Sequence, residues 1–365
     1  MLLIRLLSLA SSALAYQKLS DDWLKNVTSG GDDFDVHNGA LLAPLLITRV
    51  PGTPGQTKVQ QHFVNYFSTQ LPSWTVEWQN STDKTPKTGD RDIPFQNLII
   101  RREPPWTRTR PGQANYLTFA AHYDSKLEPK GFIGATDSAA PCAMLMHLAR
   151  SIDRRLTERY DKLNSNGEPG GTMSSDMGVQ ILLLDGEEAF DRWTATDSVY
   201  GSRSLSQEWE NTFNPAMSSY KTPLDQISIF VLLDLLGSAN PSIPSYFRTT
   251  HWAYKNMATI ESRMRGLGLL ESDSEGPFLP DGEIDAKELG TTYIGDDHEP
   301  FMHKGVPILH MIPAPFPMVW HTMDDDGDHL HMPTVRDWSK IVTAFAMEWL
   351  DLMELEPSSG QGRRI

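Results

Sequence analysis

The feature that most constrains the fold is a series of short, nearly continuous apolar runs along the chain. They lie at residues 97–100, 116–121, 179–184, 227–233 and 306–312. Strands that are buried on both faces have this pattern, because neither face meets water. Segments with helical periodicity also occur, at residues 57–71, 140–156, 245–267 and 335–355. Strands that alternate with helices predict an α/β sandwich.

The chain has 365 residues, which exceeds a typical domain of roughly 100–200 residues. We find no internal repeat and no composition break, so we predict one catalytic domain at residues 56–356. A segment rich in Gly, Asp and Pro at residues 16–55 is expected to wrap around that domain, and residues 357–365 form a tail. Two polar stretches, residues 164–176 and 271–288, are predicted to be surface insertions.

The N-terminus indicates a secretory signal peptide at residues 1–15. A short apolar run is followed by small residues at Ala13 and Ala15, the pattern that signal peptidase cleaves. A membrane anchor is the alternative, but the run is shorter than the ~20 residues that span a bilayer. We therefore expect cleavage after Ala15, secretion and no stable membrane insertion. Asn26 and Asn80 lie in Asn-x-Ser/Thr sequons, which fit a secreted glycoprotein.

Charge and cysteine content exclude several classes of protein. The formal net charge is −15, whereas a nucleic-acid-binding protein needs a positive surface for the phosphates. We therefore expect no nucleic-acid partner. The single cysteine, Cys142, excludes an intramolecular disulfide, and its place in a helical pattern predicts a packed thiol rather than a nucleophile.

Acidic and imidazole side chains follow four of the predicted strands. They are His122, Asp124, Asp185, Glu187, Glu188, Asp234 and His321. The carboxyl ends of parallel strands meet at one edge of a sheet, so these groups are expected to gather there. Crowded buried carboxylates repel unless a cation compensates, and a mixture of Asp, Glu and His suits Zn²⁺. Another acidic run, residues 324–328, lacks EF-hand spacing and is predicted to be a solvated loop.

Seven motifs in order along the chain resemble the animal-type glutaminyl-peptide cyclotransferases, or glutaminyl cyclases. This family is related to the M28 zinc aminopeptidases. The similarity runs from about residue 57 to residue 352, and the motifs lie at residues 122–126, 134–139, 185–190, 197–203, 233–237, 296–301 and 320–325.

The resemblance implies a three-layer α/β sandwich of the zinc-aminopeptidase type, with a mixed central β-sheet between helices and one Zn²⁺ per chain. The metal ligands implied by motif position are Asp137, Glu188 and His321. Glu187 matches the general acid/base of the family. Asp234 and Asp296 match two further acidic residues of a hydrogen-bonded network beside the metal, and we expect these three carboxylates to be catalytic.

The resemblance also implies the reaction and the pocket. The reaction is cyclisation of an N-terminal glutamine, more slowly glutamate, to pyroglutamate with release of ammonia or water. The expected partners are peptides or proteins that begin with Gln or Glu, and the expected state is a monomer. The residues that match the family's substrate pocket are Trp193, Ile294, Phe316 and Trp320.

Two positions depart from the family pattern. Animal members often carry a disulfide where this chain has Ala121 and Cys142, so that bridge cannot form here. We expect this change to affect stability more than chemistry. Gly295 stands where animal enzymes commonly carry a polar amide, which would loosen contacts with the substrate.

Two other functions stay open at this point. A two-zinc aminopeptidase would use the ligands His122, Asp137, Glu188, Asp234 and His321, with Glu187 activating a water to cleave the peptide bond. The motifs around Lys126, Trp193 and Trp320 favour the cyclase. An inert binding protein on the same fold is the third reading, and retention of every metal ligand and of Glu187 argues against it.

Overall fold

The structure, a computed structural model, describes residues 17–290 and 292–353. The predicted signal peptide with its cleavage site at Ala15, and the predicted tail at residues 357–365, lie outside the described residues. No helix in the described part of the chain is long and apolar enough to cross a membrane.

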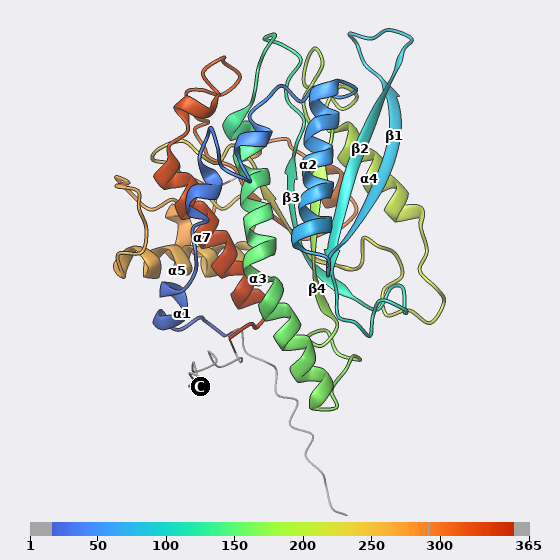
Figure 1. Cartoon of the computed structure of the whole chain (residues 1–365), viewed down its shortest axis with the longest axis vertical. Coiled ribbons are helices and arrows are strands. Elements are labelled where there is room, and N and C mark those ends of the chain that lie inside the picture. The colour runs from blue at the N-terminus through green and yellow to red at the C-terminus, as the bar shows by residue number, and fades with distance from the viewer. Residues whose placement is uncertain (1–16, 291, 354–365) are drawn as a thin grey trace, which may run out of the picture.

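A six-stranded mixed sheet forms the centre of the molecule, with strand order β1-β2-β4-β3-β5-β6 (Figure 1). β1 and β2 form an antiparallel hairpin, and β2 is also antiparallel to β4. β3 is parallel to β4 and β5, and β5 is parallel to β6. The strands span Thr75–Lys84, Asp92–Arg102, Asn115–His122, Met177–Leu184, Ile227–Leu233 and Ile308–Met311.

The five apolar runs form β2 to β6, as the sequence predicts, and of these only β6 lies at an edge of the sheet. All eight residues of β3 are buried, because helices cover both faces of the sheet at this position. β1 was not predicted: it is a polar outer strand whose residues are mostly exposed, and its pairing with β2 holds it in place.

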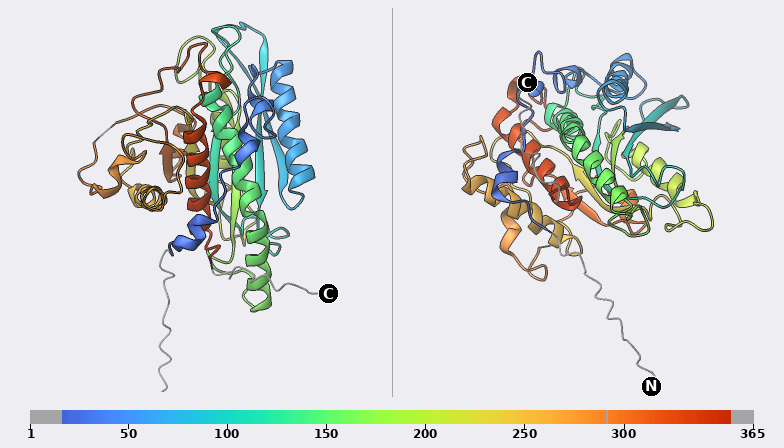
Figure 2. Two further views of the ribbon diagram at one scale, coloured as in Figure 1. Left: turned by 60° about the vertical axis from the view of Figure 1, so that its left-hand side comes forward. Right: turned by 60° about the horizontal axis from the view of Figure 1, so that its bottom comes forward.

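Helices cover the two faces of the sheet, which confirms the three-layer α/β sandwich. They are α1 Asp21–Lys25, α2 Pro54–Gln70, α3 Ala140–Ser165, α4 Tyr200–Asn211, α5 His251–Gly266, α6 Glu299–Met302 and α7 Met332–Trp349. Alternate residues of β3 show the layering. Phe119 packs with α2, α3 and α7 in one core, whereas Ala120 packs with α4 and α6 in another. In the right-hand view of Figure 2 the sheet separates α4 from α2.

The four predicted helices are present with shifted ends. α3 continues nine residues beyond the predicted end at residue 156, and α7 begins at Met332 rather than at residue 335. A proline lies in the first turn of α2, α3 and α7, where the missing N–H costs nothing because it has no partner inside the helix. α4 was not predicted.

Residues 17–53 run along the outside of α3, α5 and α7 (Figure 1). Leu24, Phe34 and Leu41 are buried in the core that these helices share with the sheet. The backbone N–H of Leu19 donates to Glu348 of α7 at 2.8 Å. This segment therefore contributes buried apolar surface to the main core.

The two polar stretches are surface loops with fixed anchors. In residues 271–288, Phe278 and Leu279 are buried, and their backbone N–H groups donate to the Glu261 carboxylate of α5 at 2.7 and 3.0 Å. In residues 164–176, the N–H of Gly171 donates to Asp176 at 2.9 Å.

Candidate active site

The chemistry-bearing side chains gather at the carboxyl ends of the parallel strands. His122 is the last residue of β3, Asp185 directly follows β4 and Asp234 directly follows β5. The three strands are neighbours in the sheet, so their ends meet at one edge. This arrangement is the one expected for ligand sites in α/β folds.

The three predicted metal ligands lie together. Ligand atoms of Asp137, Glu188 and His321 all fall within 4.8 Å of one another. His321 Nε2 lies 3.5 Å from Asp137 Oδ2 and 3.6 Å from Glu188 Oε2. Asp137 Oδ2 and Glu188 Oε1 are buried and have no hydrogen-bond partner among the described residues.

Those orphaned oxygens fit a bound cation. Burial raises the pKa of Glu188 well above its ordinary value, and the nearby Asp137 raises it further. Burial also lowers the pKa of His321, which favours the neutral imidazole that ligates metals. A divalent cation would offset the repulsion between the carboxylates and satisfy both free oxygens.

A second group of possible ligands shares Asp137. His122 Nε2 lies 2.9 Å from Asp137 Oδ1 and 3.4 Å from Asp234 Oδ1, and its Nδ1 lies 3.3 Å from Asp124. Burial alone would lower the pKa of His122, but hydrogen bonds to these three carboxylates raise it well above its ordinary value. An imidazolium at this position would carry positive charge into the acidic cluster.

Glu187 is held next to the three predicted metal ligands by its backbone. Asp124 accepts the N–H groups of Glu187 and Glu188 at 3.1 and 3.2 Å. The preceding Gly186 has a φ of +70°, and a Cβ there would lie 2.3 Å from the Phe95 ring. Burial raises the pKa of the Glu187 carboxyl well above its ordinary value, and nearby carboxylates add to the rise although His122 opposes it.

Asp234 and Asp296 have opposite electrostatic environments. Burial favours protonation of Asp234, but hydrogen bonds from His122 and Ser138 hold its pKa below its ordinary value. Burial, followed by the charge of Asp234, raises the pKa of Asp296. Environments that push two such pKa values apart are typical of acid/base assignments in enzymes.

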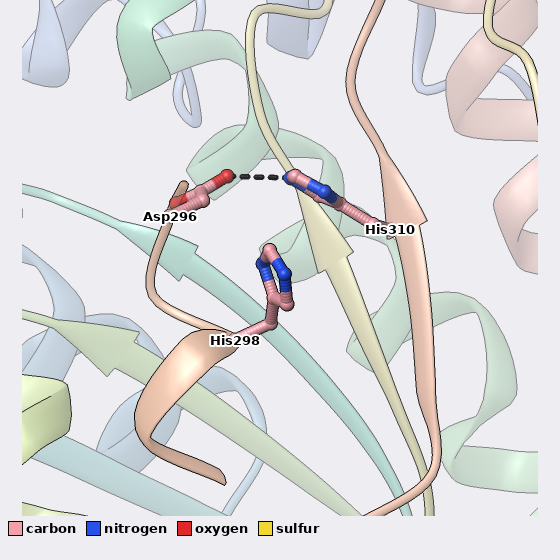
Figure 3. Close-up of side chains that lie close together, drawn as sticks. All are labelled: Asp296, His298 and His310. Carbon is pink, nitrogen blue, oxygen red and sulfur yellow. Dashed lines mark hydrogen bonds and ion pairs between the residues drawn. The ribbon is translucent and has the colours of Figure 1, made fainter. Parts of the chain in front are cut away.

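Asp296 is oriented by a histidine that the sequence reasoning missed. His310 of β6 lies with Nε2 2.7 Å from Asp296 Oδ2, the contact drawn as a dashed line in Figure 3. His298, at the start of α6, packs against His310 with ring centroids 4.3 Å apart. A lone histidine in an apolar strand carries no sequence signal of this role.

A cavity of about 390 Å³ opens onto these groups. The four predicted pocket residues, Trp193, Ile294, Phe316 and Trp320, all line it, together with Glu187, Asp234 and the three predicted metal ligands. Asp296 is buried and is not among the lining residues, but its charge contributes to the raised pKa of Glu187. The rings of Phe316 and Trp320 pack edge to face at 4.7 Å, and Trp320 stacks on His321 at 3.9 Å.

Lys126 also lines the cavity, with Nζ 3.3 Å from Glu188 Oε2. Lys126 belongs to the motif at residues 122–126 but is not one of the site residues predicted from the sequence. Trp193 is 44% exposed, and the loop that carries it is fixed by Asp197. That carboxylate accepts the N–H groups of Phe190, Asp191 and Arg192, each at 2.9 Å.

The prediction of a solvated loop at residues 324–328 was wrong for Asp325. Its carboxylate is buried and accepts the N–H of Thr136 at 2.7 Å, one residue before Asp137. Burial raises the pKa of Asp325 to about 7, and the charge of Asp137 contributes. The acidic run therefore anchors the loop that carries a predicted metal ligand.

Arg49 joins the N-terminal segment to two site loops. Its guanidinium is buried and donates to the carbonyls of Tyr123 and Asp124 after β3, and to those of Ile133 and Gly134 before Asp137. No sequence pattern marked it, because the acceptors are backbone groups. Further donations go to Leu45 and Ile47.

Cys142 is a buried free thiol, as predicted. It lies in the first turn of α3 and donates to the carbonyl of His122 at 3.2 Å. Burial raises its pKa to about 12. The thiol is therefore packed and protonated rather than nucleophilic.

Comparisons with known proteins show which family the chain resembles in sequence and fold. The sequence pattern of Peptidase family M28 matches residues 106–346. The chain is 40% identical over 316 residues to a glutaminyl-peptide cyclotransferase of Boiga irregularis, covering 85% of this chain and 80% of that protein. It is 37% identical over 316 residues to the Bos taurus glutaminyl-peptide cyclotransferase, covering 85% and 81%. The crystal structure of Macrostomum lignano glutaminyl cyclase superposes with a TM-score of 0.74 at 29% identity, covering 93% and 96% of the two chains.

Proposed function

The chain belongs to peptidase family M28 and, within it, to the glutaminyl-peptide cyclotransferases, and we propose on this basis that it cyclises N-terminal glutamine of peptides and proteins to pyroglutamate. N-terminal glutamate would react more slowly. The observation that carries the proposal is the triad of Asp137, Glu188 and His321, two buried carboxylates and a half-buried imidazole, placed beside Glu187 at an aromatic cavity.

The reaction joins two parts of one residue. The α-amine nitrogen attacks the side-chain amide carbon, a new C–N bond closes the ring, and the bond to the amide nitrogen breaks to release ammonia. Asp137, Glu188 and His321 would hold one Zn²⁺, since their orphaned oxygens and neutral imidazole suit it. Bound zinc supplies Lewis-acid polarisation of the γ-carbonyl.

Glu187 is the proposed proton carrier. It takes a proton from the attacking amine and delivers it to the departing nitrogen, so that the protons balance over the cycle. Such a two-way role requires a pKa tuned toward neutrality, and burial raises the pKa of Glu187 in that direction.

Asp234 and Asp296 are the other proposed catalytic groups. Asp234 lines the cavity as the more acidic of the two, whereas Asp296 lies behind it against His310. The two carboxylates would share one proton and so keep the charge near Glu187 constant as the proton moves.

Trp193, Ile294, Phe316 and Trp320 would hold the glutamine side chain. Their apolar surfaces exclude water from the cavity and confine a short side chain near the amine. Confinement in a cyclising geometry lowers the entropic barrier to ring closure.

A two-zinc aminopeptidase is the second candidate. The observation that favours it is the second group of possible ligands, His122, Asp137 and Asp234, which shares Asp137 with the first. In that reading Glu187 would activate a water for peptide hydrolysis. Two metals per chain would distinguish it from the cyclase.

We also propose that residues 1–15 form a signal peptide cleaved after Ala15, that the chain enters the secretory pathway, and that the mature protein acts as a monomer. Residues 16–55 would wrap a catalytic domain at residues 56–356. Asn26 and Asn80 are exposed on the surface, which is what glycosylation at these positions requires.

The deciding experiment is mass spectrometry of two peptides incubated with purified, zinc-loaded protein, one beginning with Gln and the other with Leu. Loss of one ammonia from the Gln peptide alone, with the chain intact, supports the cyclase. Release of free Leu or Gln would contradict the cyclase and support the aminopeptidase. No change in either peptide would contradict both.

Two variants test the assigned roles. Glu187→Gln should abolish turnover and retain zinc, because only the proton carrier changes. His321→Ala should lose zinc and activity together. Near-normal rates in the first variant, or a fully metallated and active second variant, would refute the corresponding role.

A further inference from the structure

Gly295 contributes only backbone to the wall of the active-site cavity. A Cβ built there would lie 3.1 Å from Trp193 Nε1 and 3.1 Å from Glu299 Oε1. The Trp193 indole and the Glu299 carboxylate therefore both lie close to the backbone of Gly295.

The Glu299 carboxylate has no cationic partner among the described residues. The hydroxyl of Tyr293 donates a hydrogen bond to its Oε1. The side chain is half-buried, and burial raises the pKa of Glu299, although His303 and His310 act in the opposite direction. A carboxylate in such a place gains from any cation that a ligand brings to it.

A second cavity, about 440 Å³, shares Trp193 with the first and is lined by Glu299. Other charged groups on its wall are already paired. Lys304 lies 3.6 Å from Glu210, and Arg203 lies 3.1 Å from Asp83. Glu299 is therefore the carboxylate on this wall that can pair with a cationic group of a bound substrate.

The position of this carboxylate relates to the path of a peptide substrate. When the first residue fills the inner cavity, the following residue must leave over its rim. Trp193 lines both cavities, so a chain that leaves the inner cavity past Trp193 enters the second cavity. The side chain of the second residue then comes close to Glu299.

We propose that Glu299 is a specificity residue that selects substrates with Lys or Arg directly after the N-terminal glutamine. Its carboxylate attracts a cationic side chain at that position and repels an acidic one. The inference rests on the proposed cyclase function and adds the substrate class to it.

The test compares three peptides, Gln-Lys-Ala-Tyr, Gln-Ala-Ala-Tyr and Gln-Glu-Ala-Tyr, by ammonia release with the zinc-loaded protein at low ionic strength. The expected kcat/KM is about five- to tenfold higher for the Lys peptide than for the Glu peptide, as for partly exposed charges. In Glu299→Gln the ratio should fall to within about twofold of one, and in Glu299→Lys it should invert.

Glu168→Gln is the matched control, because it removes one exposed carboxylate in the loop before β4, at the end of that strand opposite the site. Its ratio should equal that of the wild type. A ratio near one in the wild type, or an unchanged ratio in Glu299→Gln, would overturn the proposal.

Two further measurements separate the role of Glu299 from a failure of folding and from a failure of the cyclase function. If Glu299→Gln does not fold, the wild type is measured in 0.5 M NaCl, where a charge-based preference should shrink toward one. A preference that persists there overturns the assignment. If no peptide releases ammonia, the cyclase function itself fails, whereas cyclisation of all three at equal rates refutes only the role of Glu299.

Discussion

Replacement of Arg49 by lysine should destabilise the fold by removing donors from a buried cluster of carbonyl oxygens. Six backbone carbonyls lie 2.6–3.3 Å from the guanidinium nitrogens. A guanidinium offers five N–H donors and an ammonium three, so two or more carbonyls lose a donor while the positive charge stays.

The size of the effect follows from the number of carbonyls left without a donor. Each buried acceptor in that state costs about 1–3 kcal/mol, so two of them predict a loss of about 2–6 kcal/mol in the free energy of unfolding. Urea unfolding followed by tryptophan fluorescence, with zinc at a fixed concentration, measures this loss as a shift in midpoint at constant slope.

Arg154→Lys is the matched control, because Arg154 is an exposed residue of α3 whose ion pair with Glu158 spans 3.5 Å. It should change the free energy of unfolding by less than about 0.5 kcal/mol. A change below about 1 kcal/mol in Arg49→Lys would refute the reasoning, since it would mean that the carbonyls find other donors at little cost.

Three further outcomes are expected. Burial lowers the pKa of His147 from 6.5 to about 4, so the unfolded chain binds more protons between these values and stability falls as the pH drops. From pH 8 to pH 5 this histidine should cost about 2 kcal/mol of unfolding free energy, and an equal pH slope in His147→Gln would contradict it. Gly186→Ala should lower the free energy of unfolding by about 2–4 kcal/mol and remove most of the activity, because the new Cβ strains a backbone at φ +70° and meets the Phe95 ring at 2.3 Å. A variant that is as stable as the wild type in urea would contradict this, since it would mean that the turn relaxes. Zinc at a hundred times its dissociation constant should add about 2.7 kcal/mol of unfolding free energy to the metal-free wild type and little to His321→Ala, and equal gains would remove His321 from the site.

The sequence was sufficient to predict the parallel half of the sheet and much of the site. Strands buried on both faces leave apolar runs, and the residues after those runs meet at one edge whatever the intervening loops do. β1, Thr75–Lys84, gave no such run, because most of its residues are exposed and its pairing with β2 holds it in place. α4 was missed because three of its six buried residues, Gly201, Ser202 and Ser206, are not apolar side chains and leave a weak helical pattern around Leu205 and Trp209.

Other parts of the site depend on contacts between segments far apart in the sequence. Asp325 looks solvated within its acidic run, yet it accepts a backbone N–H from Thr136, which lies 189 positions away. Arg49 donates hydrogen bonds to backbone carbonyls, and the sequence of side chains does not indicate where such carbonyls will lie. His310 becomes a partner of Asp296 only when β6 pairs with β5.

Because the chain has a single thiol, we expect its fold to be insensitive to redox conditions. With one cysteine in the sequence, no internal cross-link can form or be reduced. Cys142 is buried, donates to a backbone carbonyl and has a pKa of about 12, so the reactive thiolate is scarce at neutral pH. Glutathione, dithiothreitol or an oxidising compartment should therefore leave the shape of the active site unchanged.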